Sequence, residues 1–253
     1  TGKFASNDQI PAMLAASGSQ MTVQHFGRTI QMFIPLYLSN HCKNRCTYCG
    51  FNVTNEIPRR VLSLAEIERE AEAIARTGMQ HVLILTGEDR RTTPPEYLCE
   101  AVAVLKRYFA SVSIEIYPLH TEEHAQLKAA GVDGMTVFQE TYDPAVYKSV
   151  HLGGKKRDFA WRLDAPARAA EAGLRTVNIG PLLGLAEPRR EMFFTGLHAR
   201  FLETNFLQTE VAVSLPRINE AEGGFSATQH VGDRLFVQLM TALRVFLPRA
   251  GIT

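Results

Sequence analysis

The stretch "HVLILTGEDRRTTPPEYLCEAVAVLKRYFASVSIEIYP", residues 81–118, carries the pattern that decides the fold. It begins and ends with short runs rich in β-branched residues, 81–88 and 111–118, which predict strands. The "TPPE" sequence at 93–96 between them is typical of a helix start. The apolar positions that follow at helical spacing are Leu98, Val102, Leu105 and Phe109. The segment therefore predicts a strand, a helix and a second strand parallel to the first.

The same alternation repeats along the chain at intervals of roughly 30 to 35 residues. The predicted strands are 32–39, 81–88, 111–118, 134–141, 175–183 and 210–217. The predicted helices are 64–78, opened by a Ser63–Glu66 capping box, then 93–109, 121–130, 159–173, 189–206 and 232–247. Six βα units with no linker between them favour one α/β domain, a TIM-like (βα) barrel, over an open doubly wound sheet.

We assign residues 33–253 to this barrel and expect residues 1–32 to form a helical segment packed beside it. A closed barrel of this type needs eight strands. Because the chain ends just after the sixth predicted helix, we expect the barrel to be open or incomplete at its C-terminus.

The composition excludes some classes of function. The net charge is +1, with 45% hydrophobic and 21% charged residues, so nothing predicts binding to nucleic acid or to an anionic membrane surface. No apolar run approaches the roughly 18 residues of a membrane span, and the opening residues do not resemble a signal peptide. We expect a cytoplasmic protein with a small-molecule ligand.

Three of the four cysteines, Cys42, Cys46 and Cys49, lie within eight residues after the first predicted strand. Structural zinc takes four protein ligands, and the only nearby candidates for a fourth are His41 and His81. A disulfide would leave one thiol over and does not suit a reducing compartment. Three thiolates can also hold an iron–sulfur cluster that keeps one iron open for a ligand from outside the protein. The fourth cysteine, Cys99, falls in a helical pattern and is predicted to be an inert packed thiol.

Other polar groups also follow predicted strands. Thr86-Gly87-Glu88 ends the second strand, Glu140 lies near the end of the fourth, and Arg217 ends the sixth. Because working residues of βα barrels lie at the C-terminal ends of the strands, these residues are expected on the same face as the cysteines.

The spacing C-x3-C-x-aromatic-C, with Tyr48 as the aromatic, resembles the signature of the radical S-adenosyl-L-methionine (SAM) enzymes. The stretches "LTGE", "QETY", "HLGGKKRDFAWRL", "GPLLGL" and "SLPR" also resemble the aromatic amino acid lyases of that superfamily, most closely the tyrosine lyases of thiamine biosynthesis. The likeness covers residues 20 to 250.

The resemblance implies that Cys42, Cys46 and Cys49 bind three irons of a 4Fe-4S cluster and that SAM binds the fourth iron. It implies further cofactor contacts from Tyr48 and from Thr86, Gly87 and Glu88, which occupy the place of a stretch that binds the methionine amino group. A small Gly87 admits the backbone, and Glu88 suits an ammonium partner.

Three further cofactor contacts rest on the resemblance alone. Glu140 would hold the ribose or methionine part of SAM, Arg162 its carboxylate, and the stretch 179–185, with Gly180 and Leu185, would lie along the adenine. Without the cysteines, we would predict a solvated loop carboxylate for Glu140, an ion pair on a helix surface for Arg162 and an ordinary buried strand for 179–185.

The substrate implied is L-tyrosine, cleaved between Cα and Cβ by a 5′-deoxyadenosyl radical to 2-iminoacetate and p-cresol. Arg217 is the candidate cation for the substrate carboxylate, with Ser214 assisting. The lyases usually carry a second arginine where this chain has Asn219.

Alternatives remain open at this level. The tyrosine lyases of iron–iron hydrogenase maturation share the same motifs, and a non-catalytic zinc or redox-sensing module is a different class. The resemblance also implies a flavodoxin or ferredoxin as reductant and a complex with thiazole synthase.

Overall fold

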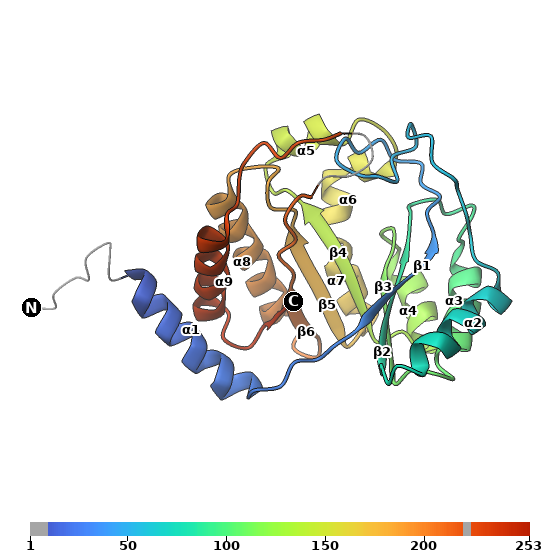
Figure 1. Ribbon diagram of the computed structural model, residues 1–253, viewed down its shortest axis with the longest axis horizontal. Coiled ribbons are helices and arrows are strands. Elements are labelled where there is room, and N and C mark those ends of the chain that lie inside the picture. The colour runs from blue at the N-terminus through green and yellow to red at the C-terminus, as the bar shows by residue number, and fades with distance from the viewer. Residues whose placement is uncertain (1–9, 220–223) are drawn as a thin grey trace, which may run out of the picture.

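The computed structural model describes residues 10–219 and 224–253, and within them seven strands form one sheet in the order of the sequence. They are β1 Ile34–Ser39, β2 His81–Thr86, β3 Ser111–Glu115, β4 Gly134–Glu140, β5 Thr176–Pro181, β6 Glu210–Val213 and β7 Gly251–Ile252. Every neighbouring pair is parallel. Figure 1 shows the strand ends rising toward a common rim of loops.

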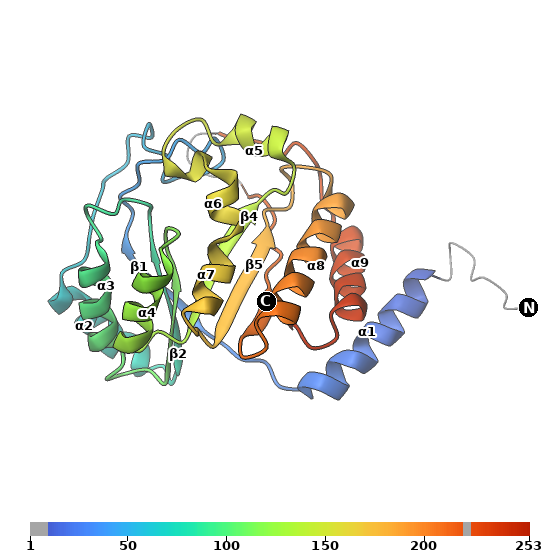
Figure 2. The same ribbon diagram turned by 180° about the vertical axis from the view of Figure 1, so that it is seen from behind.

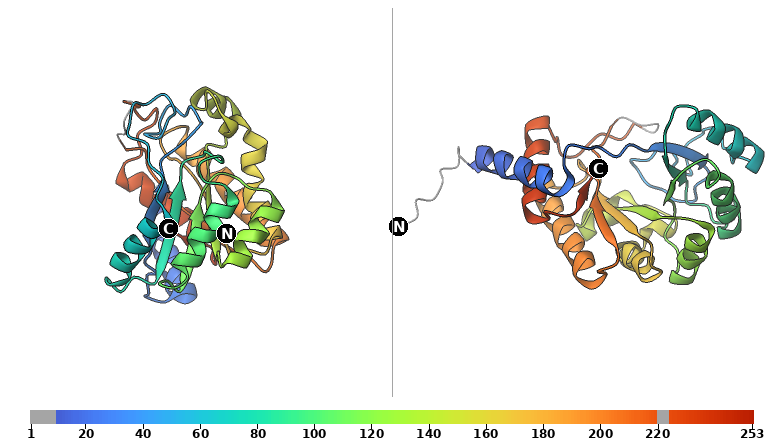
Figure 3. Two further views of the ribbon diagram at one scale, coloured as in Figure 1. Left: turned by 90° about the vertical axis from the view of Figure 1, so that its right-hand side faces the viewer. Right: turned by 90° about the horizontal axis from the view of Figure 1, so that it is seen from below.

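Most of the helices lie on the outer, convex side of the curved sheet (Figure 3). They are α1 Ile10–Phe26, α2 Leu64–Ala75, α3 Pro95–Leu105, α4 Thr121–Ala130, α5 Pro144–Val150, α6 Phe159–Leu163, α7 Ala165–Glu171, α8 Pro188–Asn205 and α9 Asp233–Phe246, with a 3₁₀ turn, η1, at Lys155–Arg157. Seen from behind, α7 lies over β4 and β5, which it contacts (Figure 2). The arrangement is that of a βα barrel, as predicted.

Strand alternation separates the two faces of the sheet. Val82 and Ile84 on β2, and Val112 and Ile114 on β3, are almost fully buried beneath the helices. Residues at the intervening positions, such as Glu115, face the inside of the curve. The helical layer therefore closes the hydrophobic core on the outside and leaves the concave face for ligands.

The six predicted strands are confirmed, and so is the Ser63–Glu66 capping box, in which each residue's side chain accepts from the other's backbone N–H. Two helix predictions were wrong in detail. The segment 159–173 breaks into α6 and α7 because Pro166 has no N–H to continue the ladder. Thr93 does not cap α3; its hydroxyl donates to the carbonyl of Asp89 instead.

Three elements were missed, β7, α5 and the short 3₁₀ turn η1. β7 has only two residues, too few for any periodicity to show. The signal for α5 was present, because Asp143 caps the N–H groups of Ala145 and Val146 and Pro144 occupies the first turn. In the described parts of the chain β1 and β7 are the two outer strands, so hydrogen bonds do not close the barrel there.

The N-terminal helix α1 packs on α9. Gly18 lies directly against the Thr241 side chain, where a Cβ would approach to 2.6 Å. The division of the chain into a segment 1–32 and a barrel 33–253 stays a prediction, and residues 1–9 of that segment lie outside the described residues.

Candidate functional site

The three clustered cysteines lie in the loop that follows β1. Cys46 is buried, Cys42 and Cys49 are half-buried, and all three are free thiols. Cys46 pairs with His151 in an antiparallel bridge, so the segment after α5 holds this loop in place. Burial raises the pKa of Cys46 to about 12 and raises that of Cys49 as well. A metal that binds them as thiolates must therefore displace their protons.

Gly87 lets the loop after β2 pack directly on the cysteine loop. A Cβ at this position would lie 2.3 Å from the carbonyl oxygen of His41. The Gly87 N–H donates to the Ser39 carbonyl at 2.9 Å, and the Lys43 N–H donates to the Glu88 carbonyl at 3.1 Å. Since no larger residue fits there, glycine fixes the distance between the two loops.

Four charged residues form a buried ion quartet beside the cysteine loop: Glu88, Glu140, Lys156 and Arg162. Arg162 reaches Glu88 at 2.7 Å and Glu140 at 3.7 Å, and Lys156 reaches Glu140 at 2.6 Å. Asn44 adds a hydrogen bond to the second oxygen of Glu88 at 2.7 Å. The side chains of Arg162 and Glu140 are only 6% and 8% exposed. Glu140 is therefore not a solvated loop carboxylate, and Arg162 does not form an ion pair on a helix surface.

The quartet keeps both carboxyls ionised. Burial raises the pKa of Glu88 and of Glu140, but the charges of Arg162 and Lys156 outweigh it, so that both pKa values lie below the usual range. Burial and the Arg162 charge lower the pKa of Lys156. The charges of Glu140, Cys46 and Glu88 raise it by a larger amount, so the pKa of Lys156 lies above its usual value. Two positive and two negative charges thus balance at the edge of the cysteine loop.

Glu140 has a strained backbone, with φ at 71° in the left-handed region. A register shift in the β4–β5 ladder falls at the same place. The next turn is fixed by Glu191 of α8, whose carboxylate accepts from the Thr141 hydroxyl at 2.9 Å and from the Tyr142 N–H at 2.8 Å. Strain of this kind persists only where the surroundings enforce it, and here it aims a carboxylate at the site.

Tyr48 is tied to the segment after α5. Its hydroxyl donates to Nε2 of His151 at 2.7 Å, because Nδ1 of His151 donates to the Tyr147 carbonyl at 2.8 Å. Burial and the nearby Lys156 charge lower the pKa of His151 to about 4, so this ring is neutral. Tyr48 is therefore held as a fixed side wall of the cysteine loop.

The remaining predicted residues lie farther along the rim. A Cβ on Gly180 would approach the Ser214 carbonyl to 2.1 Å, which brings the ends of β5 and β6 together. Leu185 is buried, and the Thr86 hydroxyl is buried without a hydrogen-bond partner among the described residues. Ser214 accepts a hydrogen bond from Asn178 at 2.8 Å.

Arg217 is placed apart from the ion quartet. Its guanidinium pairs with Asp233 at the start of α9 at 2.7 Å and lies 4.8 Å from the centre of the Phe236 ring. The side chain is 40% exposed. Its role in binding a substrate carboxylate stays a prediction.

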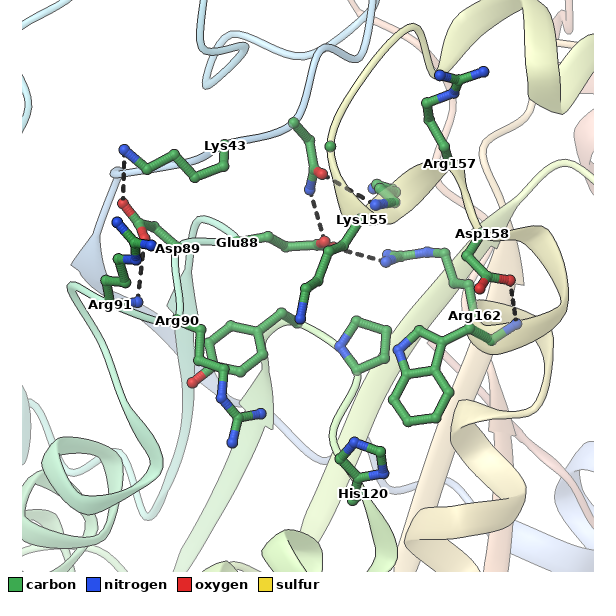
Figure 4. Close-up of a pocket in the computed structure, with 16 residues that line it drawn as sticks. Lys43, Glu88, Asp89, Arg90, Arg91, His120, Lys155, Arg157, Asp158 and Arg162 are labelled. Atoms are coloured by element: carbon green, nitrogen blue, oxygen red, sulfur yellow. Dashed lines mark hydrogen bonds and ion pairs between the residues drawn. The ribbon is translucent and has the colours of Figure 1, made fainter.

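A cleft of about 1380 Å³ lies beside the quartet (Figure 4). The Glu88–Arg162 pair lines it, as do Trp161 and His120, whose ring centres lie 4.8 Å apart. Arg157 and Lys155 line it without an ion-pair partner in the described part of the chain. Lys43 and Asn44 of the cysteine loop also line it, so this basic cleft adjoins both the quartet and the cysteine loop.

The family model for the radical SAM superfamily matches residues 36–194, which contain the cysteine loop and the whole ion quartet. The chain belongs to the radical SAM superfamily. Members of this superfamily use a 4Fe-4S cluster and SAM, so the family implies both cofactors for this chain.

Two curated relatives are 2-iminoacetate synthases. The chain is 37% identical to that of Salmonella typhimurium and 39% identical to that of Escherichia coli, in each case over 241 residues. These matches cover 95% of this chain and 64% of each relative. The chain thus spans less than two thirds of the length of these relatives.

Solved structures of similar shape include two of HydG, a maturase of the [FeFe]-hydrogenase. One, from Carboxydothermus hydrogenoformans, has a TM-score of 0.93 at 34% identity and covers 98% of this chain and 59% of that one. The other has the same TM-score at 29% identity and covers 98% of this chain and 56% of that one. The fold is therefore that of radical SAM enzymes with TIM-type barrels.

The residues present fit the two cofactors of the radical SAM family. Three thiols share one loop, and thiolates are the usual ligands of iron–sulfur clusters. No three His, Cys, Asp or Glu side chains of the described residues lie as ligands of one metal ion would. A cubane cluster requires a different arrangement, because each thiolate binds its own iron. The buried Thr86 hydroxyl and Gln139 carboxamide, at strand ends nearby, have no hydrogen-bond partner among the residues that the structure describes.

Sequence reasoning missed Lys156 and Asn44. Lys156 stands in a run of three basic residues, and nothing in the pattern distinguishes it from its exposed neighbours Lys155 and Arg157. Asn44 lies between two of the cysteines, where its amide joins the loop to Glu88 while its carbonyl oxygen accepts from the Lys156 N–H. Both roles come from contacts between distant segments.

Among the described residues, no helix has the length and apolar character needed to cross a membrane.

Proposed function

We propose that this protein is a radical SAM lyase that cleaves the Cα–Cβ bond of L-tyrosine to give 2-iminoacetate and p-cresol for thiamine thiazole biosynthesis. The observation that carries this proposal is the identity of 37–39% to 2-iminoacetate synthases over 95% of the chain. The cysteine loop and the ion quartet support it, because they supply a cluster site and a charged wall on the same rim.

In this proposal Cys42, Cys46 and Cys49 hold the 4Fe-4S cluster. When bound, the cluster and SAM together supply a radical that abstracts hydrogen from the substrate. Glu88 and Glu140 accept hydrogen bonds from the amino and hydroxyl groups of SAM, and Arg162 neutralises its carboxylate. The concave face of the sheet surrounds the substrate and limits its access to water.

The substrate carboxylate needs a cation in the site. Arg217 is the proposed clamp, with Ser214 beside it, and Asn219 stands where related lyases have a second arginine. For Arg217 to serve, its guanidinium must exchange the Asp233 carboxylate for that of the substrate. This exchange keeps the cation paired throughout.

Two protein partners belong to the proposal. A low-potential flavodoxin or ferredoxin would supply the electron, and thiazole synthase would take up the unstable imine. We also propose that the protein works in the cytoplasm, where thiols stay reduced.

Product analysis tests the reaction. The protein, reconstituted anaerobically with iron and sulfide, is incubated with SAM, L-tyrosine and dithionite, and the products are separated by liquid chromatography. We expect p-cresol and glyoxylate, the hydrolysis product of 2-iminoacetate, in equal amounts.

The similarity to HydG supports a second candidate, a tyrosine lyase of hydrogenase maturation. p-Cresol with cyanide and carbon monoxide would replace the first proposal by this one. SAM cleavage without p-cresol would reject both.

A further inference from the structure

One layer of side chains crosses the concave face of the sheet just below the cysteine loop. The ladder pairs Tyr37 of β1 with Leu85 of β2, and Leu85 with Glu115 of β3. Farther along, Thr136 of β4 pairs with Asn178 of β5. Residues in register point to the same side of a sheet, so these side chains line one level of the barrel interior.

Glu115 is the carboxylic acid of this layer. Its neighbours Ile114 and Ile116 are buried, at 0% and 4% exposure, so alternation turns Glu115 to the concave side. The side chain is half-buried, and it has no hydrogen bond or ion pair with any residue that the structure describes. A carboxyl in such a wall needs a donor from elsewhere.

Glu115 interacts electrostatically with residues of the ion quartet. Burial and the Glu140 charge raise its pKa to about 7, against the opposing charges of Lys156 and Arg162. On the other side of the layer, burial, Glu115 and Cys49 together raise the pKa of Tyr37. Glu115 therefore lies within electrostatic reach of both the ion quartet and the cysteine side of the barrel.

Among the other polar side chains of the layer, Asn178 and Thr136 are hydrogen-bonded to each other, whereas Oδ1 of Asn178 has no hydrogen-bond partner among the described residues. The Asn178 amide donates to Ser214 at 2.8 Å and to Thr136 at 3.3 Å. The interior thus offers one acidic group without a partner among the described residues, and an α-amino acid brings one ammonium group. A charged donor to a carboxylate forms one of the stronger hydrogen bonds in proteins.

We propose that Glu115 binds the ammonium group of the amino-acid substrate and selects for it. This inference rests on the proposed function, in which the substrate is L-tyrosine. It makes the interior of the barrel specific for amino acids as opposed to carboxylic acids with the same aromatic side chain.

Equilibrium dialysis under anaerobic conditions tests this inference on the holoprotein with SAM. The two probes are L-tyrosine and 3-(4-hydroxyphenyl)propionate, which lacks only the amino group. In Glu115→Gln we expect the Kd for tyrosine to rise about tenfold or more, because a hydrogen bond to a charged group is lost. The Kd for the propionate should stay as it is in the wild type.

Two further variants serve as controls. Glu115→Asp keeps the charge and should retain a clear preference for tyrosine over the propionate. Glu122→Gln removes an exposed carboxylate on α4 and should bind both probes as the wild type does. Melting temperatures and the Kd for SAM, measured for each variant, report on folding and on the cofactor site.

The outcomes separate the two claims. Three results for Glu115→Gln would overturn the role of Glu115: an equal rise in Kd for both probes, a loss of SAM affinity as large as the loss of tyrosine affinity, or no change in any Kd. If the wild type still binds tyrosine in these cases, the proposed function stands. A wild type that binds no tyrosine would reject the proposed function and this inference together.

Discussion

At the scale of single residues, Arg162 is the residue that links the two carboxylates of the ion quartet. It is the cation that pairs with both carboxylates, and its Nε also donates to the Phe138 carbonyl at 2.6 Å. Charges buried this deeply are tolerated only when each has its partner. Arg162 therefore matters to the stability of the empty protein as well as to the cofactor site.

Replacing Arg162 with methionine should lower the free energy of unfolding by about 3–5 kcal/mol, since Glu88 and Glu140 lose a buried partner. Arg175→Met provides the matched control, because Arg175 and its partner Glu210 are largely exposed, and it should cost less than about 1 kcal/mol. Urea denaturation at pH 7.5 measures both values. Equal losses in the two variants would contradict the description of the quartet.

At the scale of elements, α4 carries a fully buried histidine and α8 a half-buried one. His124 on α4 is fully buried, and neither ring nitrogen has a hydrogen-bond partner in the described ranges. His198 on α8 shares a hydrogen bond with the Tyr142 hydroxyl at 2.9 Å. Burial lowers the pKa of each to about 4, so both rings are neutral in the folded protein.

These histidines predict a loss of stability in mild acid. The folded-state pKa of His124 is about 4 and the ordinary value is 6.5, so the unfolded chain takes up the proton first as the pH falls. Its contribution is complete above pH 6.5, is reduced by about 2 kcal/mol at pH 5, and levels off below pH 4.

His124→Leu should remove this part of the pH dependence. The measurement is the free energy of unfolding in urea at pH 7.5 and at pH 5.0, and the variant should lose about 2 kcal/mol less than the wild type between them. A variant with the same slope as the wild type would show that His124 is protonated in the fold.

At the scale of the whole molecule, the order and type of the long elements could be predicted from the sequence. The strands β1 to β6 are apolar runs between turn signals, and the barrel follows from their repetition. β7 could not be found, because two residues show no pattern. The break between α6 and α7 was signalled by Pro166 but was outweighed by the apolar periodicity on either side.

The site was predictable where chemistry is local in the chain. Three cysteines in one loop indicate a metal site whatever the fold. Glu88, Glu140 and Arg162, in contrast, come together only when two different strand ends and a helix pack side by side. Lys156 completes that group from the three-residue 3₁₀ turn η1, which is too short to show a periodicity, and Arg217 pairs with Asp233 at the start of α9. Contacts of this kind depend on tertiary packing.

In the proposed function, Cys42, Cys46 and Cys49 hold a 4Fe-4S cluster, and SAM binds the one iron that has no cysteine ligand. Electron paramagnetic resonance of the reduced, anaerobically reconstituted protein, with and without SAM, tests it most directly. We predict about four irons and four sulfides per chain, a signal that changes when SAM is added, and no such signal in Cys46→Ala. A colourless protein with one zinc per chain, or a cluster signal that SAM leaves unchanged, would contradict it.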